Sequence, residues 1–297
     1  MRITSCKNGG SVTSPTYAGG ILGYCAANEG DKEIADCVNT GKINSNSSAG
    51  GILGGYFSFN VGVENDGKTR LVHCINGGEI SGNTVGGIVG EGLDIIVTVS
   101  LENCVNEGEV KGATRAGGIL GNDAIASITK TEQSLFYING CANLGSVSLG
   151  DGQQPFAAVD SASPAQNGDA YGQTMMLLGG KCLGGITGSM RQSRMEGCVN
   201  AGLLYADTGS VFAGTTGDMA SLMEDENSPL VFAGGLCGQY MFLESNTLDN
   251  SGIRSCIYEN TAPISHSTAG QFGGEDSVAD NSAVDAAAAK QAAEQLT

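Results

Sequence analysis

The chain has few basic residues, few prolines and no long apolar run, and each shortage excludes a class of protein. Lys and Arg number 14 against 31 Asp and Glu, and they are scattered singly. A surface for nucleic acid or anionic lipid is therefore excluded. Five prolines accompany 48 glycines without a strict triplet, which excludes collagen. No apolar run approaches the roughly 18 residues of a membrane span, so no direct membrane insertion is expected.

Signals for metal binding and for secretion are also missing. The chain holds ten cysteines but no C-x-x-C pair, so neither zinc nor another cofactor is expected. Met1 and Arg2 lead directly into Ile3 without the apolar region of roughly 7–15 residues that a signal peptide needs. Because the chain starts inside a repeat, we expect it to be a piece of a longer protein with flanking domains.

What the sequence does contain is a repeat that runs through nearly the whole chain. A heading motif, C-x-N-x-G-x-[IVL], starts at Cys6, Cys37, Cys74, Cys104, Cys141 and Cys198, with a worn copy at Cys256. A closing box such as GGILG starts at Gly19, Gly50, Gly86, Gly117, Gly184 and Gly234. Self-similarity at a fixed period indicates one elongated array rather than two ordinary domains.

The residues around each cysteine predict the fold class. Large apolar residues stand three positions before it (Ile3, Ile34, Leu71, Leu101, Ile138, Met195, Ile253) and six after it (Val12, Ile43, Ile80, Val110, Val147, Leu204). We expect both sets to line one interior, with three strands per repeat, around the cysteine, the aliphatic at +6 and the closing box. The prediction is an all-β, right-handed parallel β-helix (β-solenoid) of about seven coils over residues 1–279.

Residues 280–297 are rich in alanine and predict a short C-terminal α-helix. Ser282 to Asp285 resemble a capping box that would open it. The helix is expected either to fold back over the open end of the solenoid or to begin a linker.

The other repeated residues are expected to serve the stack. The cysteines should form an inward ladder of reduced thiols, because parallel side chains one coil apart have the wrong geometry for a disulfide. Glycine at +4 is expected at a corner with positive φ, and the double glycine of each box where backbones approach closely. Asparagine recurs at +2, as Asn8, Asn39, Asn76, Asn106, Asn143 and Asn200. Coil-to-coil amide stacking is the favoured interpretation, and a glycan-binding row is the alternative.

The boxes that follow C-x-N-x-G-x-[IV] segments, from Gly19 to Gly234, resemble the GLUG-motif repeats of bacterial surface proteins. Such repeats also occur outside the catalytic domain of immunoglobulin A-specific metallopeptidases, and the resemblance covers roughly residues 3–274. It implies a secreted or wall-attached bacterial protein and therefore an extracellular or cell-surface location. It implies no activity, and the HExxH motif of those metallopeptidases is absent here.

Two long inserts are where binding residues are expected. Cys141 reaches its box only after 43 residues and Cys198 after 36, against 12 or 13 in earlier coils. The inserts, near residues 148–181 and 205–232, should leave neighbouring coils at the same corner, and long loops on a rigid array often carry function. The candidate ligand-binding residues are Tyr171, Tyr205, Asp207, Phe212, Asp218 and Glu224. No catalytic or metal-ligating residue is predicted.

The expected function is a non-catalytic structural or adhesive region, a stalk or a surface that binds host glycans or surface proteins. The alternative is a carbohydrate-active β-helix in which acidic residues of the inserts form the catalytic pair. In a chain with a formal charge of −17, these carboxylates are also explained as a solvated charge run.

Overall fold

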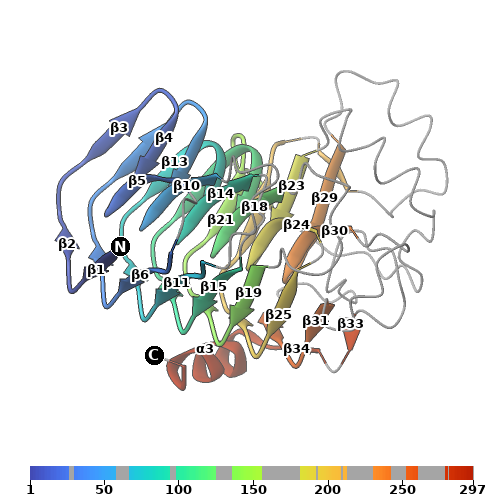
Figure 1. The fold of residues 1–297 in the computed structure, drawn as a ribbon. Coiled ribbons are helices and arrows are strands. Elements are labelled where there is room, and N and C mark those ends of the chain that lie inside the picture. Colours follow the sequence, from blue (N-terminus) through green and yellow to red (C-terminus); the bar gives the residue numbers. More distant parts are fainter. Residues whose placement is uncertain are drawn as a thin grey trace.

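The computed structural model describes residues 1–26, 30–57, 67–93, 98–124, 136–155, 181–191, 193–208, 210–212, 230–241, 252–259, 278–279 and 281–296. Within them, short strands stack rung upon rung into four sheets, here named A to D (Figure 1). All strand pairs in the described part are parallel except one at the root of the inserts. The predicted parallel β-solenoid is thereby confirmed.

Sheets A and B hold the residues on either side of each cysteine, with eight strands each. Sheet A contains β1 (Arg2–Thr4), β6 (Lys32–Ala35), β11 (Thr69–Val72), β15 (Val99–Glu102), β19 (Phe136–Asn139), β25 (Arg194–Glu196), β31 (Gly252–Arg254) and β33 (Val278–Ala279). Sheet B contains β2 (Lys7–Asn8), β7 (Val38–Asn39), β12 (Ile75–Asn76), β16 (Val105–Asn106), β20 (Ala142–Asn143), β26 (Val199–Asn200), β32 (Ile257–Glu259) and β34 (Ser282–Val284).

Sheets C and D hold the rest of each repeat. Sheet C contains β3 (Val12–Ser14), β4 (Tyr17–Gly19), β8 (Ile43–Ser45), β9 (Ser48–Gly50), β13 (Ile80–Gly86), β17 (Val110–Gly117), β21 (Val147–Leu149), β22 (Gln154–Pro155), β23 (Lys181–Gly184), β27 (Leu204–Ala206), β28 (Val211–Phe212) and β29 (Leu230–Gly234). Sheet D starts inside each closing box and contains β5 (Leu22–Ala26), β10 (Leu53–Phe57), β14 (Val89–Leu93), β18 (Leu120–Ala124), β24 (Thr187–Arg191) and β30 (Cys237–Met241).

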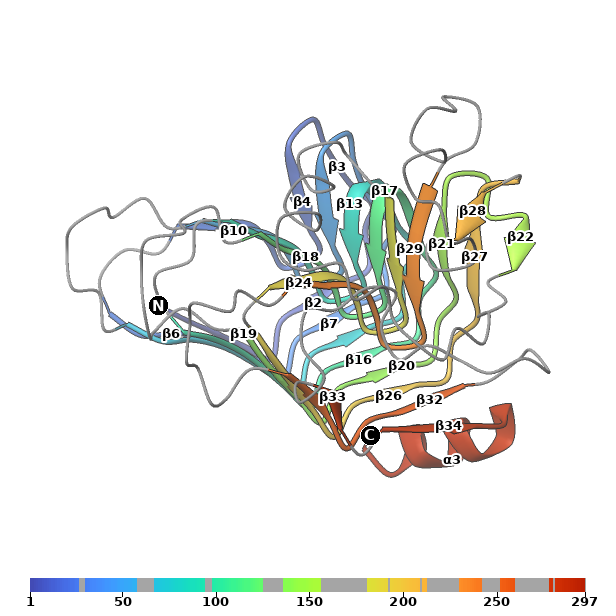
Figure 2. The same ribbon diagram turned by 90° about the vertical axis from the view of Figure 1, so that its right-hand side faces the viewer.

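Figure 2 looks along the stack from its C-terminal end and shows the cross-section of a rung. Sheet C stands upright as two arms, while sheets D and A enclose the space on the left of the view. The chain passes through A, B, C and D counterclockwise as rungs approach the viewer, which is the predicted right-handed turn. The number of about seven coils stays a prediction, because parts of several rungs fall outside the described residues.

The corner between sheets A and B differs from the prediction. Each ladder cysteine lies at this corner rather than inside a strand, and sheet C is divided into two strands in some rungs, so a rung has four or more strand segments where three were expected. The residue before each cysteine has a positive φ, between 50° and 61°: Ser5, Asp36, His73, Asn103, Gly140, Gly197 and Ser255. Asn, Asp, His and Gly are enriched in this left-handed region, and Ser is the exception among the seven. The positive φ of the residue before each ladder cysteine therefore produces the bend between sheets A and B.

The glycine at +4 serves close packing, so its predicted positive φ is wrong. A Cβ added to Gly78 would lie 2.0 Å from the carbonyl oxygen of Gly41 in the preceding rung. The same contact recurs from Gly108 to Gly78. In the closing box, a Cβ on Gly118 would lie 2.1 Å from the carbonyl oxygen of Gly185, which confirms the predicted close approach. Successive backbones therefore approach closely at the +4 glycines and in the closing boxes.

The interior is divided into two apolar clusters, whereas the sequence predicted one. The residues before each cysteine, such as Leu71, pack with the cysteines and with box aliphatics such as Ile88 between sheets A and D. The aliphatics at +6, such as Ile80, pack instead between the two arms of sheet C, against small residues such as Ala49. Each rung thus contributes separately to two parallel columns of buried side chains.

The repeated asparagines form a buried ladder of amides along the stack. Asn76 is fully buried, and its Nδ2 donates to Oδ1 of Asn106 at 2.8 Å and to its own rung's Gly78 carbonyl at 2.9 Å. Its Oδ1 accepts from Nδ2 of Asn39 and from the Gly78 N–H. All four hydrogen-bonding places of the amide are filled. This confirms the stacking interpretation, and burial rules out the alternative of a glycan-binding row.

The C-terminal helix takes a position that neither expectation foresaw. Helix α3 (Ala286–Glu294) is capped by Asp285, whose Oδ1 accepts the Ala288 N–H at 2.8 Å. Ser282 lies in β34 instead of capping the helix, so the last strands extend past the predicted boundary at 279. The helix folds back beneath sheet B (Figure 1). Ala293 belongs to one buried cluster with outward side chains of several rungs. These are Val105, Ala142 and Val199.

The paired glycines of one corner provide a matched test of close packing. A Cβ on Gly78 meets backbone at 2.0 Å, whereas the nearest atom to a Cβ on Gly77 lies at 3.9 Å. Gly78→Ala should therefore destabilise the chain by about 1–3 kcal/mol through overpacking, and Gly77→Ala by less than about 0.5 kcal/mol. Thermal unfolding followed by circular dichroism measures both. Equal losses in the two variants would contradict the contact, since the effect on the unfolded chain is the same for both.

Candidate functional site

The roots of the two inserts are joined by hydrogen bonds between their aspartates. The carboxylate of Asp151, after β21, accepts the Thr208 N–H at 2.9 Å and the Thr208 hydroxyl at 2.8 Å. The carboxylate of Asp207, after β27, accepts the Asp151 N–H at 2.6 Å and an ion pair from Lys181. The Thr208 hydrogen bonds lower the pKa of Asp151. The inserts therefore leave neighbouring rungs side by side, as predicted.

The insert boundaries need correction. Leu149, Ala206 and Val231 lie in strands of sheet C and are fully buried. Residues near 148–149, 205–206 and 230–232 therefore belong to the rungs, because they lie in strands of sheet C and the side chains of Leu149, Ala206 and Val231 fill the column between its arms.

The structure places three of the six predicted binding residues. Tyr205 lies half-buried in β27, and Asp207 follows it with its carboxylate occupied by the contacts of the insert roots. Phe212 lies in β28, paired in register with Val231. The other three, Tyr171, Asp218 and Glu224, lie outside the described residues. Among the described residues, no group of three or more His, Cys, Asp or Glu side chains could hold a metal ion.

The cysteine ladder is built for packing. Cys37, Cys74, Cys104, Cys141, Cys198 and Cys256 are fully buried, and only the terminal Cys6 among the ladder cysteines is exposed. The Cys141 thiol donates to the Leu101 carbonyl of the preceding rung at 3.4 Å. Burial raises the pKa of Cys141 well above its ordinary value. His73 faces solvent, away from the buried Cys74, so the two do not form a nucleophilic pair.

A partly buried carboxyl lies where sheets C and D meet. Glu91 in β14 accepts from Nδ2 of Asn122 in β18 at 3.1 Å. Burial raises the pKa of Glu91, while the Asn122 hydrogen bond and the Arg115 charge partly oppose the shift. A raised carboxyl pKa is one mark of a functional site, but structural networks produce it as well. The partners of Glu91 are the Asn122 and Arg115 side chains of neighbouring strands, so we interpret the Glu91 carboxyl as structural.

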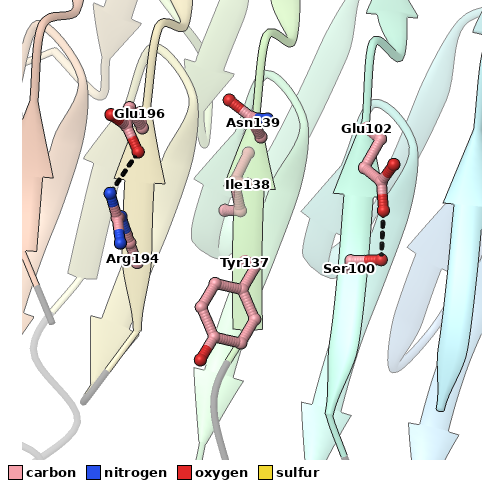
Figure 3. Close-up of a pocket in the computed structure, with 7 residues that line it drawn as sticks. All are labelled: Ser100, Glu102, Tyr137, Ile138, Asn139, Arg194 and Glu196. Carbon is pink, nitrogen blue, oxygen red and sulfur yellow. Dashed lines mark hydrogen bonds and ion pairs between the residues drawn. The ribbon is translucent and has the colours of Figure 1, made fainter. Parts of the chain in front are cut away.

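A cavity of about 320 Å³ lies on the outer face of sheet A. It spans three strands and is lined by Ser100, Glu102, Tyr137, Ile138, Asn139, Arg194 and Glu196. Strand alternation places residues at −4 and −2 from each cysteine outward, because the residue at −3 points into the core. Figure 3 shows the ring of Tyr137 between two pairs of polar side chains. One pair comes from β15 and the other from β25.

The charges around this cavity compensate one another. The Glu102 carboxylate accepts from Arg70 at 2.9 and 3.1 Å and from the Ser100 hydroxyl at 2.8 Å. The Arg70 hydrogen bond lowers the pKa of Glu102 and keeps it ionised. On the other side Arg194 pairs with Glu196. Each wall carboxylate is therefore paired with one guanidinium, that of Arg70 standing one strand beyond the lining, and Tyr137 and Asn139 between the walls are uncharged.

Sequence reasoning missed this cavity although a signal was present. The outward position four residues before the cysteine holds Arg2, Glu33, Arg70, Ser100, Tyr137 and Arg194 in successive repeats. Tyr137 is the single aromatic residue among these six, and Ser100 beside it is the smallest of them. The row could have been read from strand alternation, but the cavity needed the register Ser100–Tyr137–Arg194 that the sheet supplies.

No family model, no curated protein and no solved structure matches the chain. The resemblance to GLUG-motif repeats therefore stays a prediction that rests on the boxes and headings themselves. Within the part of the chain that the structure describes, no helix has the length and apolarity to cross a bilayer.

The ladder predicts how the thiols react with a disulfide reagent. All ten cysteines are free, and Cys6 is the exposed member. One thiol should react rapidly in the native chain, since burial keeps the others from forming accessible thiolates. All ten should react in denaturant without a reductant. The Cys6→Ser variant should lose the rapid phase, and fewer reactive thiols in denaturant would indicate bridges that contradict the free ladder.

The partly buried Glu91 predicts a pH-dependent stability difference. Because burial raises its pKa above the ordinary 4.5, its stabilising contribution is fully present below pH 4.5 and is lost as the pH rises through the raised value. Glu91→Gln stays neutral and keeps an oxygen for Asn122. The variant should therefore melt about 2 °C or more above the unaltered chain at pH 7, with the difference vanishing near pH 4. A variant that melts lower at pH 7 would show that the Arg115 charge outweighs burial.

Proposed function

We propose that the chain is the non-catalytic structural and adhesive region of a bacterial secreted or cell-surface protein, a stalk that carries a surface for host glycans or surface proteins. The supporting observation is the use of the repeated residues. The asparagines at +2 from Asn39 to Asn200, the cysteines from Cys37 to Cys256 and the apolar residues at −3 from Ile34 to Ile253 are all buried in the stack. The repeat thus maintains a scaffold, and outward positions are left to vary.

The GLUG-like boxes support the same proposal from the sequence. Six boxes recur in register with their headings, and the repeats they resemble belong to bacterial surface proteins. A long acidic solenoid suits an exposed stalk, since its charge of −17 opposes self-association and contact with anionic surfaces. The extracellular location in this proposal depends on that resemblance.

The carbohydrate-active alternative is less well supported by the described acidic residues. Its acid pair would lie in the inserts, where the Asp151 and Asp207 carboxylates are occupied by hydrogen bonds and an ion pair. In the cavity on sheet A, Arg70 lowers the pKa of Glu102. A general acid needs the opposite shift, because it must hold its proton near neutral pH. These carboxylates suit binding better than proton transfer.

A combined binding and turnover assay tests the proposal. The full chain would be applied to immobilised neutral and acidic polysaccharides and to host glycoproteins and matrix proteins. The same polysaccharides would be incubated with the chain in solution and assayed for new reducing ends. We expect retention on at least one surface without release of products, because the chain binds and does not cleave.

The thermally unfolded chain is the control for nonspecific retention. Release of reducing ends above that control would overturn the non-catalytic proposal and favour the carbohydrate-active alternative. Retention on no surface would contradict the adhesive role.

A further inference from the structure

We propose that the cavity on the outer face of sheet A binds a short uncharged oligosaccharide, with the Tyr137 ring as its stacking platform. This inference rests on the proposed function and assigns its ligand class and its location. It moves the expected contact surface from the inserts to the flank of the solenoid, where no binding residue was predicted.

Tyr137 supplies a flat apolar surface beside polar groups. It is half-buried in β19, in register with Ser100 on one side and Arg194 on the other. The Ser100 side chain is short, so it covers little of the side of the Tyr137 ring that faces it. Figure 3 shows the ring in the middle of the group. Amphipathic rings offer large contact area with few rotors. A pyranose ring matches such a platform, because it presents C–H groups on its face and hydroxyls at its rim.

The walls supply acceptors for those hydroxyls. An ionised carboxylate has about four lone-pair sites, and Glu102 uses three of them on Arg70 and Ser100. Glu196 receives one hydrogen bond from Arg194. Both carboxylates therefore keep acceptor capacity, and the exposed Asn139 amide between them both donates and accepts. Charge-assisted hydrogen bonds of this kind are stronger than neutral ones.

Charge balance selects an uncharged ligand. The two glutamates are each paired with an arginine, Arg70 from the strand beyond the lining and Arg194 within it, so neither carboxylate offers an uncompensated charge to a cation. The surrounding chain carries a formal charge of −17, which repels acidic glycans such as those with uronic or sialic acids.

The dimensions suit a short segment of a glycan. Glu102 and Glu196 stand on strands two spacings apart, about 10 Å at roughly 4.8 Å per spacing. The volume of about 320 Å³ lies at the lower end of the range of about 300–1,000 Å³ for ligand sites. The walls face each other along the solenoid axis, so a sugar on Tyr137 is held between them.

Isothermal titration calorimetry on the full chain tests the site. The probes are cellohexaose, maltohexaose, xylohexaose and mannohexaose, with a hyaluronan hexasaccharide as the acidic comparison. We expect at least one neutral probe to bind more tightly than hyaluronan. Tyr137→Ala should weaken that binding by about tenfold or more, the usual effect of removing a central aromatic contact.

Two matched variants separate the ring from general effects. Tyr137→Phe keeps the platform and should stay within about threefold of the unaltered chain. Tyr24→Ala removes a tyrosine of sheet D that is 36% exposed and should leave binding unchanged. Thermal unfolding of each variant shows that the solenoid is intact before titration.

The outcomes separate this inference from the proposed function. Equal binding by Tyr137→Ala, a preference for hyaluronan, or binding to proteins alone would overturn the oligosaccharide site and leave the adhesive function standing. Binding lost on deletion of 213–229 but kept in Tyr137→Ala would return the site to the inserts. Failure of every glycan and protein surface to retain the chain would overturn both.

Discussion

The solenoid depends on a column of asparagine amides that links each rung to the next. From Asn8 to Asn200 each Nδ2 donates to the following Oδ1 at 2.7 or 2.8 Å. A buried amide without partners costs more than the bond itself contributes, so one rung out of register would leave two amides unsatisfied. At the end of the column, the last amide donates to the carbonyl of Gly235. The ladder therefore sets the register, and the close glycine contacts set how tightly the rungs stack.

Much of the fold could be predicted because the residues that recur in the repeat are the ones buried in the interior. A position that must be buried in every rung keeps its residue type, so the cysteines, asparagines and apolar residues could be assigned to a stack before any coordinates. The corners were harder to predict. The turn at His73 and Asn103 depends on a positive φ that several residue types tolerate, so no single residue type marks it in the repeat. The division into two apolar columns depends on the path of sheet C, which the spacing does not reveal.

The candidate site was less predictable, for a related physical reason. An outward residue contributes to no column, so nothing in the repeat marks Tyr137 as different from Arg70 or Ser100 in the same row. The cavity around Tyr137 is formed by residues about 30 to 60 positions away in the sequence. They become its neighbours only through the register of β15, β19 and β25. Length drew attention to the inserts instead, and there the structure placed Asp207 in a contact that holds the two roots together.

Helix α3 changes how the array should come apart. In a simple solenoid each rung is held only by its neighbours, and opening can begin at either end. Here the helix packs against β26 and β32, and its Ala293 shares a buried cluster with side chains of β16, β20 and β26, which joins four strands. The outward Ile75 of β12 is not part of this cluster and is 37% exposed. Among the described rungs, opening should therefore begin on the N-terminal side of this cluster, and amide hydrogen exchange should slow in steps toward the half that the helix joins.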